Sequence, residues 1–545
     1  MLITNSSISI NTQASISIQT NSDAIVSTQN VIDTSNLLEI PTPKLPTKDV
    51  VPVASPASIV TLSDTNAVAE PANVYEAPVE IIKTRNTQDK TDTEKNVSKL
   101  LTNNLTSIRA KKSIFSVQSL FSQVGALSRE TTSYKNEARN FSASASKTAD
   151  TNALDFSISG GKPAQGVTLR VTTKDGDTID IQIQRTTRDN NDSLAFSFSV
   201  KGKLSTEEQD ALEKLANKLG EVADDFFRTG TTQLHGLKDF DKTTLQGFHI
   251  DFSKPKVNNL YSTMSYDFSV DDKNNTQHLT AKDADNYSID ITNDLQNILG
   301  GTSATAKDSL QAYLKIIRDA MNEHQPLGED HSNKFSLQFI IDSFTSMIDG
   351  EQPEESSTSL TQKAMTAFDT GLPDFNATIK APVLKKFKNL MLPESMSLNL
   401  MQKTEIEYQK DGGKLIKQTN SFEHKSSKIA GILGSDKGDL DTGNFKYKTI
   451  DEKQQIVRIL DLNEKGINNV ITERTSSTNN TEKTYNSFHL VDSNKDQHSE
   501  RTITQLVDEI SPHKSLGESS ERTSYFEKLA YVAKSAKNLF LLPTR

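Results

Sequence analysis

Four stretches between residues 153 and 200 alternate apolar and polar side chains with a period of two. Their apolar positions are Leu154, Phe156 and Ile158; Val167, Leu169 and Val171; Ile179, Ile181 and Ile183; and Leu194, Phe196, Phe198 and Val200. Such alternation is typical of strands that bury one face and expose the other. Asp175-Gly176 stands between the second and third runs, where the tolerance of glycine for positive φ favours a hairpin turn. The pattern predicts a small antiparallel sheet with one apolar face.

The segment after the fourth run predicts a helix that covers this apolar face. Ser205 and Glu208 form a capping-box pattern, in which each side chain bonds the free backbone N–H of the other residue. Apolar side chains then recur at steps of three and four, at Leu212, Leu215, Leu219, Val222 and Phe226. Gly230 lies where the helix is expected to end. Residues 153–252 are therefore predicted to form one unit, an antiparallel sheet plus a helix.

Three stretches of this unit, which Phe248 and Phe252 would close, carry a resemblance to a known domain. They are the hairpin Lys174-Asp175-Gly176-Asp177, the strand end Phe198-Ser199-Val200-Lys201-Gly202, and the helix from Leu204-Ser205 to Asp225-Phe226-Phe227. On these residues the unit resembles a domain of uncharacterised gammaproteobacterial proteins of unknown function. The resemblance covers under a fifth of the chain. It implies a bacterial source and carries over no functional residue.

Residues 92–145 predict helix, because their apolar side chains recur at steps of three and four. The Ser/Ala stretch from Phe141 to Ala149 loses this spacing and is expected to be a connection. A second hairpin is expected over 261–291, with its turn at 271–276. Its two strands are expected to face each other through Tyr266, Phe268 and Val270 on one and Tyr287, Ile289 and Ile291 on the other.

The second half of the chain predicts helices and then long strands. Helices are expected at about 305–324, 334–349, 358–370 and 524–540. A hairpin about Asp411-Gly412 is expected over 405–422, and strands over 445–491 with a turn near Gly466. Thr, Asn, Lys and Glu dominate the outward positions of these strands. One face of this sheet is therefore expected to be solvated.

These patterns place the chain in the α+β class: a small antiparallel β-meander packed on a helix, a central helical region and a C-terminal antiparallel β region, preceded by a disordered tail. The expected parts are a Ser/Thr/Pro-rich disordered tail at 1–91, a helical segment and connection at 92–150, the sheet plus helix at 153–252, a hairpin and helical region at 259–392, polar antiparallel strands at 393–495 and a C-terminal helical segment at 500–545.

The tail is predicted to be disordered because residues 1–90 hold seven of the 16 prolines and a single aromatic residue, Tyr75. The first 30 residues contain 11 Ser or Thr, seven Asn or Gln, six Ile and one charged residue, Asp23. This composition resembles the uncleaved N-termini of type III secretion and flagellar export substrates. A terminus with a slight β tendency is the other interpretation.

The net charge, the cysteine content and the distribution of apolar residues limit which partners and which cellular locations are expected. The net charge of −10 opposes nucleic-acid binding, which needs concentrated positive charge; the best basic run is Lys385, Lys386 and Lys388. The chain has no cysteine, no apolar run of the roughly 20 residues that span a membrane, and no basic residue before Lys44 to begin a cleavable signal. We expect no nucleic acid, no integral membrane segment, and a cytoplasmic location by default or secretion without a cleavable signal.

The common catalytic motifs each fail at one residue. A P-loop needs Ser or Thr after its Gly-Lys pair to reach magnesium, but Pro163 and Leu415 follow the two nearest Gly-Lys pairs. A nucleophile elbow needs a small residue two positions after its serine, and Glu521 stands there after Ser519.

Possible metal ligands are also incomplete. His324 and His331 are separated by Pro326, so one helix cannot hold both on a face. Asp439 and Asp441 begin a calcium-like loop, but its twelfth position carries Ile450 in place of a bidentate Glu.

Two pairs of aspartates remain, and both are predicted to be structural. Asp283 and Asp285 lack the glycine of a calcium loop, so we expect an ordinary polar turn. Asp224 and Asp225 are expected to be exposed carboxylates near a helix end. No catalytic, cofactor-binding or metal-binding residue and no cofactor is therefore assigned from the sequence.

Three hypotheses of function follow. The leading one is a non-enzymatic bacterial interaction or structural protein with an unidentified protein partner. The second is an exported substrate of a type III or flagellar apparatus, which rests on the first 30 residues. The third is a hydrolase with no linear motif, built on dispersed acidic residues within 293–390.

Overall fold

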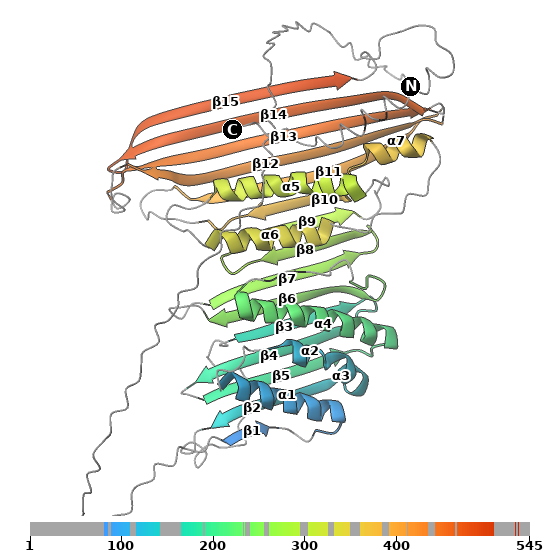
Figure 1. Ribbon diagram of the computed structural model, residues 1–545, viewed down its shortest axis with the longest axis vertical. Helices are drawn as coiled ribbons and strands as arrows, with labels where there is room; N and C mark the ends of the chain where they lie inside the picture. The colour runs from blue at the N-terminus through green and yellow to red at the C-terminus, as the bar shows by residue number, and fades with distance from the viewer. Residues whose placement is uncertain are drawn as a thin grey trace, which may run out of the picture. The chain divides into compact units, whose positions relative to one another are not determined.

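A computed structural model gives the structure of the protein. The described residues are 81–85, 89–109, 116–141, 165–188, 191–230, 232, 234, 240–255, 261–294, 303–324, 332–348, 360–383, 392–410, 412–433, 442–463, 466–505, 529 and 532. Their fold is a mixed α+β one that is mostly β. Its strands form one antiparallel sheet, covered by helices on one face (Figure 1).

The sheet has the strand order β1-β2-β5-β4-β3-β6, and from β6 to β15 each strand pairs with the next one in sequence. The strands are β1 (Ile81–Arg85), β2 (Ser133–Phe141), β3 (Gln165–Thr173), β4 (Thr178–Arg188), β5 (Asn191–Lys201), β6 (Leu245–Pro255), β7 (Tyr261–Asp271), β8 (Thr276–Lys282), β9 (Ser288–Asp294), β10 (Asp374–Lys380), β11 (Ser395–Tyr408), β12 (Lys414–Ile432), β13 (Phe445–Asn463), β14 (Gly466–Asn486) and β15 (His489–Gln505).

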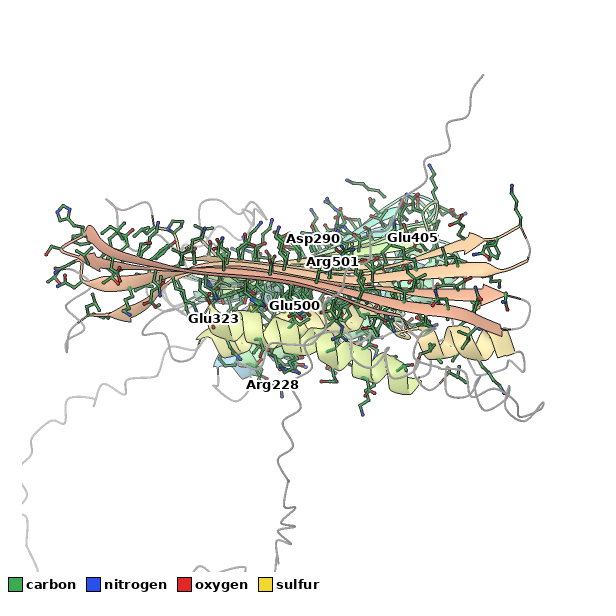
Figure 2. The ribbon with its side chains drawn as sticks, turned by 90° about the horizontal axis from the view of Figure 1, so that it is seen from above. Arg228, Asp290, Glu323, Glu405, Glu500 and Arg501 are labelled. Atoms are coloured by element: carbon green, nitrogen blue, oxygen red, sulfur yellow. The ribbon has the colours of Figure 1, made fainter. Side chains whose placement is uncertain are left out.

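The helices lie on one side of this sheet, as the edge-on view in Figure 2 shows. They are α1 (Asp92–Arg109), α2 (Gln118–Phe121), α3 (Val124–Glu130), α4 (Thr206–Thr229), α5 (Ser303–Glu323), α6 (Ser332–Ile348) and α7 (Leu360–Phe368). Helix α1 packs on β2 and β5, α4 on β3 and β6, α6 on β8 and β9, α5 on β11, and α7 on β14. Alternate side chains of the strands are buried under this layer, which leaves the other face of the sheet free of described helices.

The sheet-plus-helix unit follows the prediction from its local sequence. The 167–171, 179–183 and 194–200 runs form β3, β4 and β5, and their inward apolar side chains are buried. Gly176 has φ 91° in the turn between β3 and β4. Helix α4 starts with the predicted capping box and ends at Gly230, whose φ is 87°. The predicted small sheet is nevertheless part of the larger one, because β5 also pairs with β2 and β3 with β6.

The prediction of helix over 92–145 is wrong after Glu130. Helices α1, α2 and α3 occupy the first part, but Ser133–Phe141 forms β2 and pairs with β1 and β5. The strand period is hidden because one of its inward positions is polar: Asn136 is buried between Tyr134 and Ala138. The side-chain amide of Asn136 donates to the hydroxyls of Tyr134 and Ser98. These hydrogen bonds allow a polar residue at a buried position, where the sequence pattern required an apolar one.

Two further strands were missed, for a similar reason. The predicted hairpin over 261–291 is wrong in its pairing, because β8 lies between β7 and β9 and pairs with both. Its inward side chains are Gln277, Leu279 and Ala281, which form a weak apolar pattern. Strand β10, inside the predicted helical region 259–392, carries Phe375, Ala377 and Ile379 on its buried side and joins β9 to β11.

The remaining predictions divide into three groups. The helices expected at 305–324, 334–349 and 358–370 are confirmed as α5, α6 and α7, and the turn residues Gly412 and Gly466 have φ 84° and 118°. Two expected boundaries are wrong. Strand β1 occupies Ile81–Arg85, within the predicted disordered tail at 1–91, and β15 runs to Gln505, beyond the predicted end of the strands at 495 and into the predicted helical segment at 500–545. The run at 154–158, residues 1–80 and most of the helix expected at 524–540 lie outside the described residues.

The capping box gives a direct test of this part of the fold. Ser205→Ala removes the acceptor for the Glu208 backbone N–H, so it is expected to lower the free energy of unfolding by about 1 kcal/mol. Ser205→Asp keeps an acceptor at the same place and should retain most of the stability. Chemical denaturation followed by circular dichroism measures both variants; equal stability of Ser205→Ala and the wild type would contradict the role of the cap.

Candidate functional site

One transverse row of polar side chains crosses the helix-free face of the sheet. Starting from β2, the directly paired residues are Ser133, Ser199, Asp180, Arg170, His249, Asp267, Thr280, Asp290, Thr378, Asn399, Glu423, Lys453, Ser477 and Ser499. We call these residues the central row. Each strand from β2 to β15 contributes one member, and none of the members is apolar.

Members of the central row are bound to one another along the sheet. Arg170 Nε lies 2.7 Å from Asp180 Oδ1, and Lys453 Nζ lies 3.0 Å from Glu423 Oε1. The Thr378 hydroxyl donates to Asn399 Oδ1 over 3.0 Å. Exposed pairs of this kind contribute at most about 1 kcal/mol each. Their main effect is to fix the pattern of charge and hydrogen-bonding groups on the surface.

The centre of the row is acidic and contains a histidine held by two carboxylates. His249 Nδ1 lies 3.1 Å from Asp267 Oδ2, and its Nε2 lies 2.9 Å from Asp251 Oδ2. Partial burial lowers the pKa of His249, but the hydrogen bonds and charges of Asp251 and Asp267 outweigh it and raise the pKa above 6.5. His278 makes a similar contact, with its Nε2 2.9 Å from Asp290 Oδ1. Protonation of His249 therefore partly neutralises this patch.

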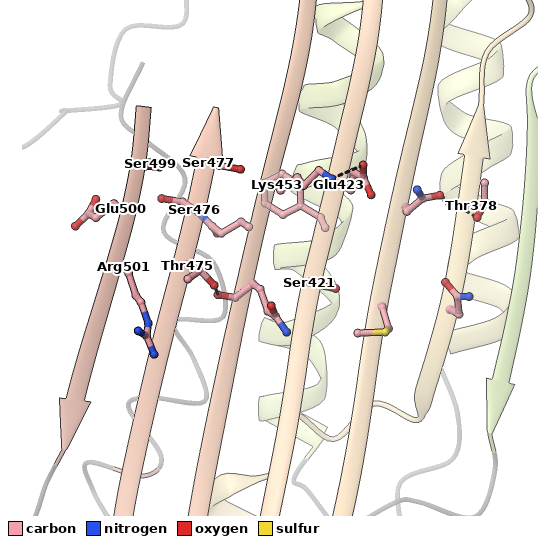
Figure 3. A pocket seen from close by; sticks show the side chains of 16 residues that line it. Thr378, Ser421, Glu423, Lys453, Thr475, Ser476, Ser477, Ser499, Glu500 and Arg501 are labelled. Carbon is pink, nitrogen blue, oxygen red and sulfur yellow. Dashed lines mark hydrogen bonds and ion pairs between the residues drawn. The ribbon is translucent and has the colours of Figure 1, made fainter. Parts of the chain in front are cut away.

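A hollow of about 910 Å³ lies on the same face over β10–β15 (Figure 3). Its lining includes the central-row residues Thr378, Asn399, Glu423, Lys453, Ser477 and Ser499. Met401, Ser421, Gln455, Thr475 and Arg501 form the parallel row beside them. Most of the lining residues carry a hydroxyl or an amide group, and the Glu423–Lys453 ion pair lies among them, as the dashed line in Figure 3 shows. The hollow offers donors and acceptors from six neighbouring strands.

Sequence reasoning did not find this surface. The outward residues of the later strands are visibly polar, but a transverse row depends on the register of every strand pair. That register includes β8 and β10, which the sequence pattern did not reveal. Figure 2 shows Asp290 and Glu405 on the helix-free side, opposite Glu323 and Arg228 on the helix side.

A buried polar cluster lies behind the hollow, on the helix-covered face. The Asn420 amide donates to the Tyr313 hydroxyl and to Gln402 Oε1, each over 2.9 Å. Gln402 also accepts from the Thr370 hydroxyl and donates to the Leu372 carbonyl. These side chains connect α5, β11 and β12 with the segment before β10. Because buried polar groups must be paired, they favour one register among these elements.

Arg458 extends this cluster across β13. Its guanidinium is fully buried, donates from Nη2 to Gln418 Oε1 and lies 4.8 Å from the centre of the Phe368 ring. The Gln418 amide donates to Thr404, whose hydroxyl donates to Asp374 Oδ1 over 2.8 Å. Burial raises the pKa of Asp374 to about 6, although the N–H and hydroxyl of Thr404 both donate to it. Asp374 is one of the acidic residues within 293–390 on which the hydrolase hypothesis rests, and its carboxylate is held by hydrogen bonds from Thr404.

The two pairs of aspartates considered in the sequence, Asp283 with Asp285 and Asp224 with Asp225, are not brought together into one site. Asp283 lies in the expected polar turn, where its Oδ1 accepts from the backbone N–H groups of Asp285 and Tyr287. Burial raises the pKa of Asp283 to about 6. Asp224 accepts from the Ser116 hydroxyl and from the N–H groups of Val117 and Gln118, so it holds the start of α2. Asp225 forms an ion pair with Arg228.

His324 is buried at the end of α5, and His331 lies outside the described residues. The basic run at 385–388 also lies outside the described residues. So do three of the incomplete motifs: the P-loop pattern at 161–163, the start of the calcium-like loop at 439–441 and the nucleophile-elbow pattern at 517–521. Gly443 and Ile450 are described: Gly443 has φ 77° and its carbonyl accepts from the backbone N–H of Phe488, and Ile450 is buried. The Gly413-Lys414 pair lies at the turn that begins β12.

Within the described part of the chain, no three His, Asp or Glu side chains are grouped to hold a metal ion. None of the helices that the structure describes is long and apolar enough to cross a membrane. No family model, curated protein or solved structure matches this chain.

Acid unfolding tests the environment of His324. Burial, and then the charge of Lys428, lower its pKa from 6.5 to about 4. Between these pH values the unfolded chain binds a proton that the folded chain does not, so stability falls as the pH falls from 6.5 to 4. The His324 contribution to this loss is on the order of 3 kcal/mol.

The measurement compares urea unfolding at pH 7 and pH 4.5. His324→Leu should reduce the loss of stability between these pH values, whereas His498→Leu, which changes an exposed histidine, should not. An unchanged pH dependence in His324→Leu would contradict the buried, neutral state of this side chain.

Proposed function

We propose that this protein is a non-enzymatic bacterial interaction protein, and that the helix-free face over β10–β15 is its binding surface. The observation that carries the proposal is the polar hollow lined by side chains from six adjacent strands. Main-chain pairing and the helix layer behind the sheet fix these side chains in position. A fixed array of donors and acceptors lowers the entropic cost of binding a partner.

The chemistry of the surface favours a polar partner. Hydroxyl and amide groups are joined by charges of both signs, such as Glu423, Lys453 and Arg501. Such a surface recognises its partner by a pattern of hydrogen bonds and charges, and charged groups contribute mainly specificity. The partner is therefore expected to be a protein with a hydrophilic, mixed-charge contact region.

Two neighbouring positions on β14 give a matched test. Ser477 lies on the helix-free face and lines the hollow, whereas Thr478 is the next residue and points to the opposite face. Ser477→Trp places a bulky side chain in the hollow, and Thr478→Trp adds the same bulk on the other side. Tryptophan is tolerated well in strands, so both variants should remain folded by circular dichroism.

The two variants and the wild-type chain are used to capture partners from a lysate of the source organism. Ser477→Trp is expected to weaken capture by about tenfold or more, equal to about 1.4 kcal/mol, and Thr478→Trp to leave it unchanged. Equal capture by both variants would contradict the proposed surface. Capture of no partner, together with turnover in a substrate-profiling assay, would overturn the non-enzymatic function.

A second proposal, independent of the first, is that the protein is exported by a type III or flagellar apparatus. It is supported by the Ser-, Ile- and Asn-rich composition of residues 1–30 and by the absence of cysteine. Fusion of residues 1–30 to a reporter should give export that depends on the apparatus. Retention of the reporter in cells with a working apparatus would contradict the proposal.

A further inference from the structure

The last strand of the sheet, β15, is a long edge. It spans His489–Gln505 and pairs on one side with β14. Among the strands that the structure describes, none pairs with its other side. All residues from His489 to Ile503 are exposed. At the opposite edge of the sheet β1 has only five residues.

The composition of β15 does not block pairing with another strand. Edge strands are commonly protected by short length, proline, charged side chains or bulges. Strand β15 has 17 residues and no proline, its five charged residues are of both signs and can therefore be matched by a partner, and its bulge at Val491 lies near one end. Large exposed apolar side chains lie near both ends of the strand: Phe488 in the preceding turn, Leu490 and Val491 near its start, and Ile503 near its end. These features favour a strand that is covered by a specific partner.

We propose that the partner is a second copy of this chain, bound through antiparallel pairing of β15 with its own copy about a two-fold axis at Gln497. Residue 497 is the midpoint of His489–Gln505, so in this register the two copies overlap along their whole length. The regular part of the strand begins at Asp492, because β14 leaves Val491 without a partner at a bulge. Such an interface is self-complementary and closed, as in most homodimers. It also follows the general mode in which an exposed edge accepts an additional strand.

Backbone geometry restricts the possible registers. In a regular edge strand, alternate residues direct their N–H and C=O groups outward, and a hydrogen-bonded antiparallel pair needs such a residue on both strands. Two copies of the regular part of β15 can therefore pair only odd positions with odd ones and even with even. The same rule places the helix-free faces of the two copies on one side, as a continuous surface.

Charge selects among the permitted registers. Centred on Gln497, the pairing places Asp496 opposite His498, Lys495 opposite Ser499, and Asp492 opposite Thr502, and no two like charges are opposite each other. A shift that centres it on Asp496 places this residue opposite its own copy and Asp492 opposite Glu500.

The shift in the other direction, centred on His498, places Lys495 opposite Arg501 and Asp496 opposite Glu500. Like charges directly opposite each other destabilise a strand pair. Centring on Ser499 avoids like charges but leaves His489–Asp492 beyond the pair. The Gln497 register is therefore the one that combines full overlap with charge compatibility.

The absence of cysteine makes the register measurable by cross-linking. In the proposed pair the two copies of position 497 are directly opposite, with Cα atoms roughly 4.5–5.5 Å apart, within the range of a disulfide. The two copies of position 499 are offset by four residues, about 14 Å along the strands, which is beyond disulfide reach. Both side chains are exposed on the same face.

The experiment uses the full chain with Gln497→Cys or, as the matched control, Ser499→Cys. Light scattering of the wild type should give twice the chain mass of 60.1 kDa. Mild oxidation should cross-link Gln497→Cys into a covalent dimer and leave Ser499→Cys mostly uncross-linked. A monomeric wild type, or cross-linking of Ser499→Cys equal to or above that of Gln497→Cys, would overturn the proposal. Circular dichroism confirms that both variants are folded.

Discussion

The structure depends on main-chain pairing that continues from strand to strand while each strand buries mainly one of its faces. A small buried cluster of Ile429, Phe445, Tyr447 and Tyr485 lies on the other face of β12–β14. Every pair in the ladder is antiparallel, so the inward residues of one strand are followed by those of the next. Helices α1 to α7 cover this inward side. The hydrophobic burial between the two layers stabilises the sheet, and most of the outward side is left to carry polar residues. The central row is a direct result of this arrangement.

The helix-covered side is not uniformly apolar. A large hydrophobic core extends from Val97 to Phe422, and a smaller one contains Phe368, Leu460 and Val532. The buried polar cluster around Arg458, Gln418 and Asn420 lies among the strands that carry both cores. A buried charge is costly unless it is paired, so such a cluster contributes more to a unique register than to net stability. The surface hollow on the other face of β11–β13 depends on the same register.

The sequence predicted well those elements in which propensity, capping and periodicity agree. Helix α4, with Ser205 and Gly230 at its ends, is the clearest case. Strands β2, β8 and β10 were missed because polar or small residues such as Asn136, Gln277 and Ala377 occupy inward positions. The candidate surface could not be predicted for a physical reason: its residues come from six strands, and a single missed strand changes which side chains are adjacent.

Strand β10 is the most direct test of the continuous sheet, because it joins the strands before α5 to those after α7. Hydrogen exchange of the full chain measures whether its amides are paired on both sides. The structure predicts that Phe375–Ile379 exchange as slowly as the amides of β9 and β11, as expected for interior strands. Fast exchange of β10 beside slow exchange in β7 and β12 would show two separate sheets, and it would contradict a polar row that crosses the molecule.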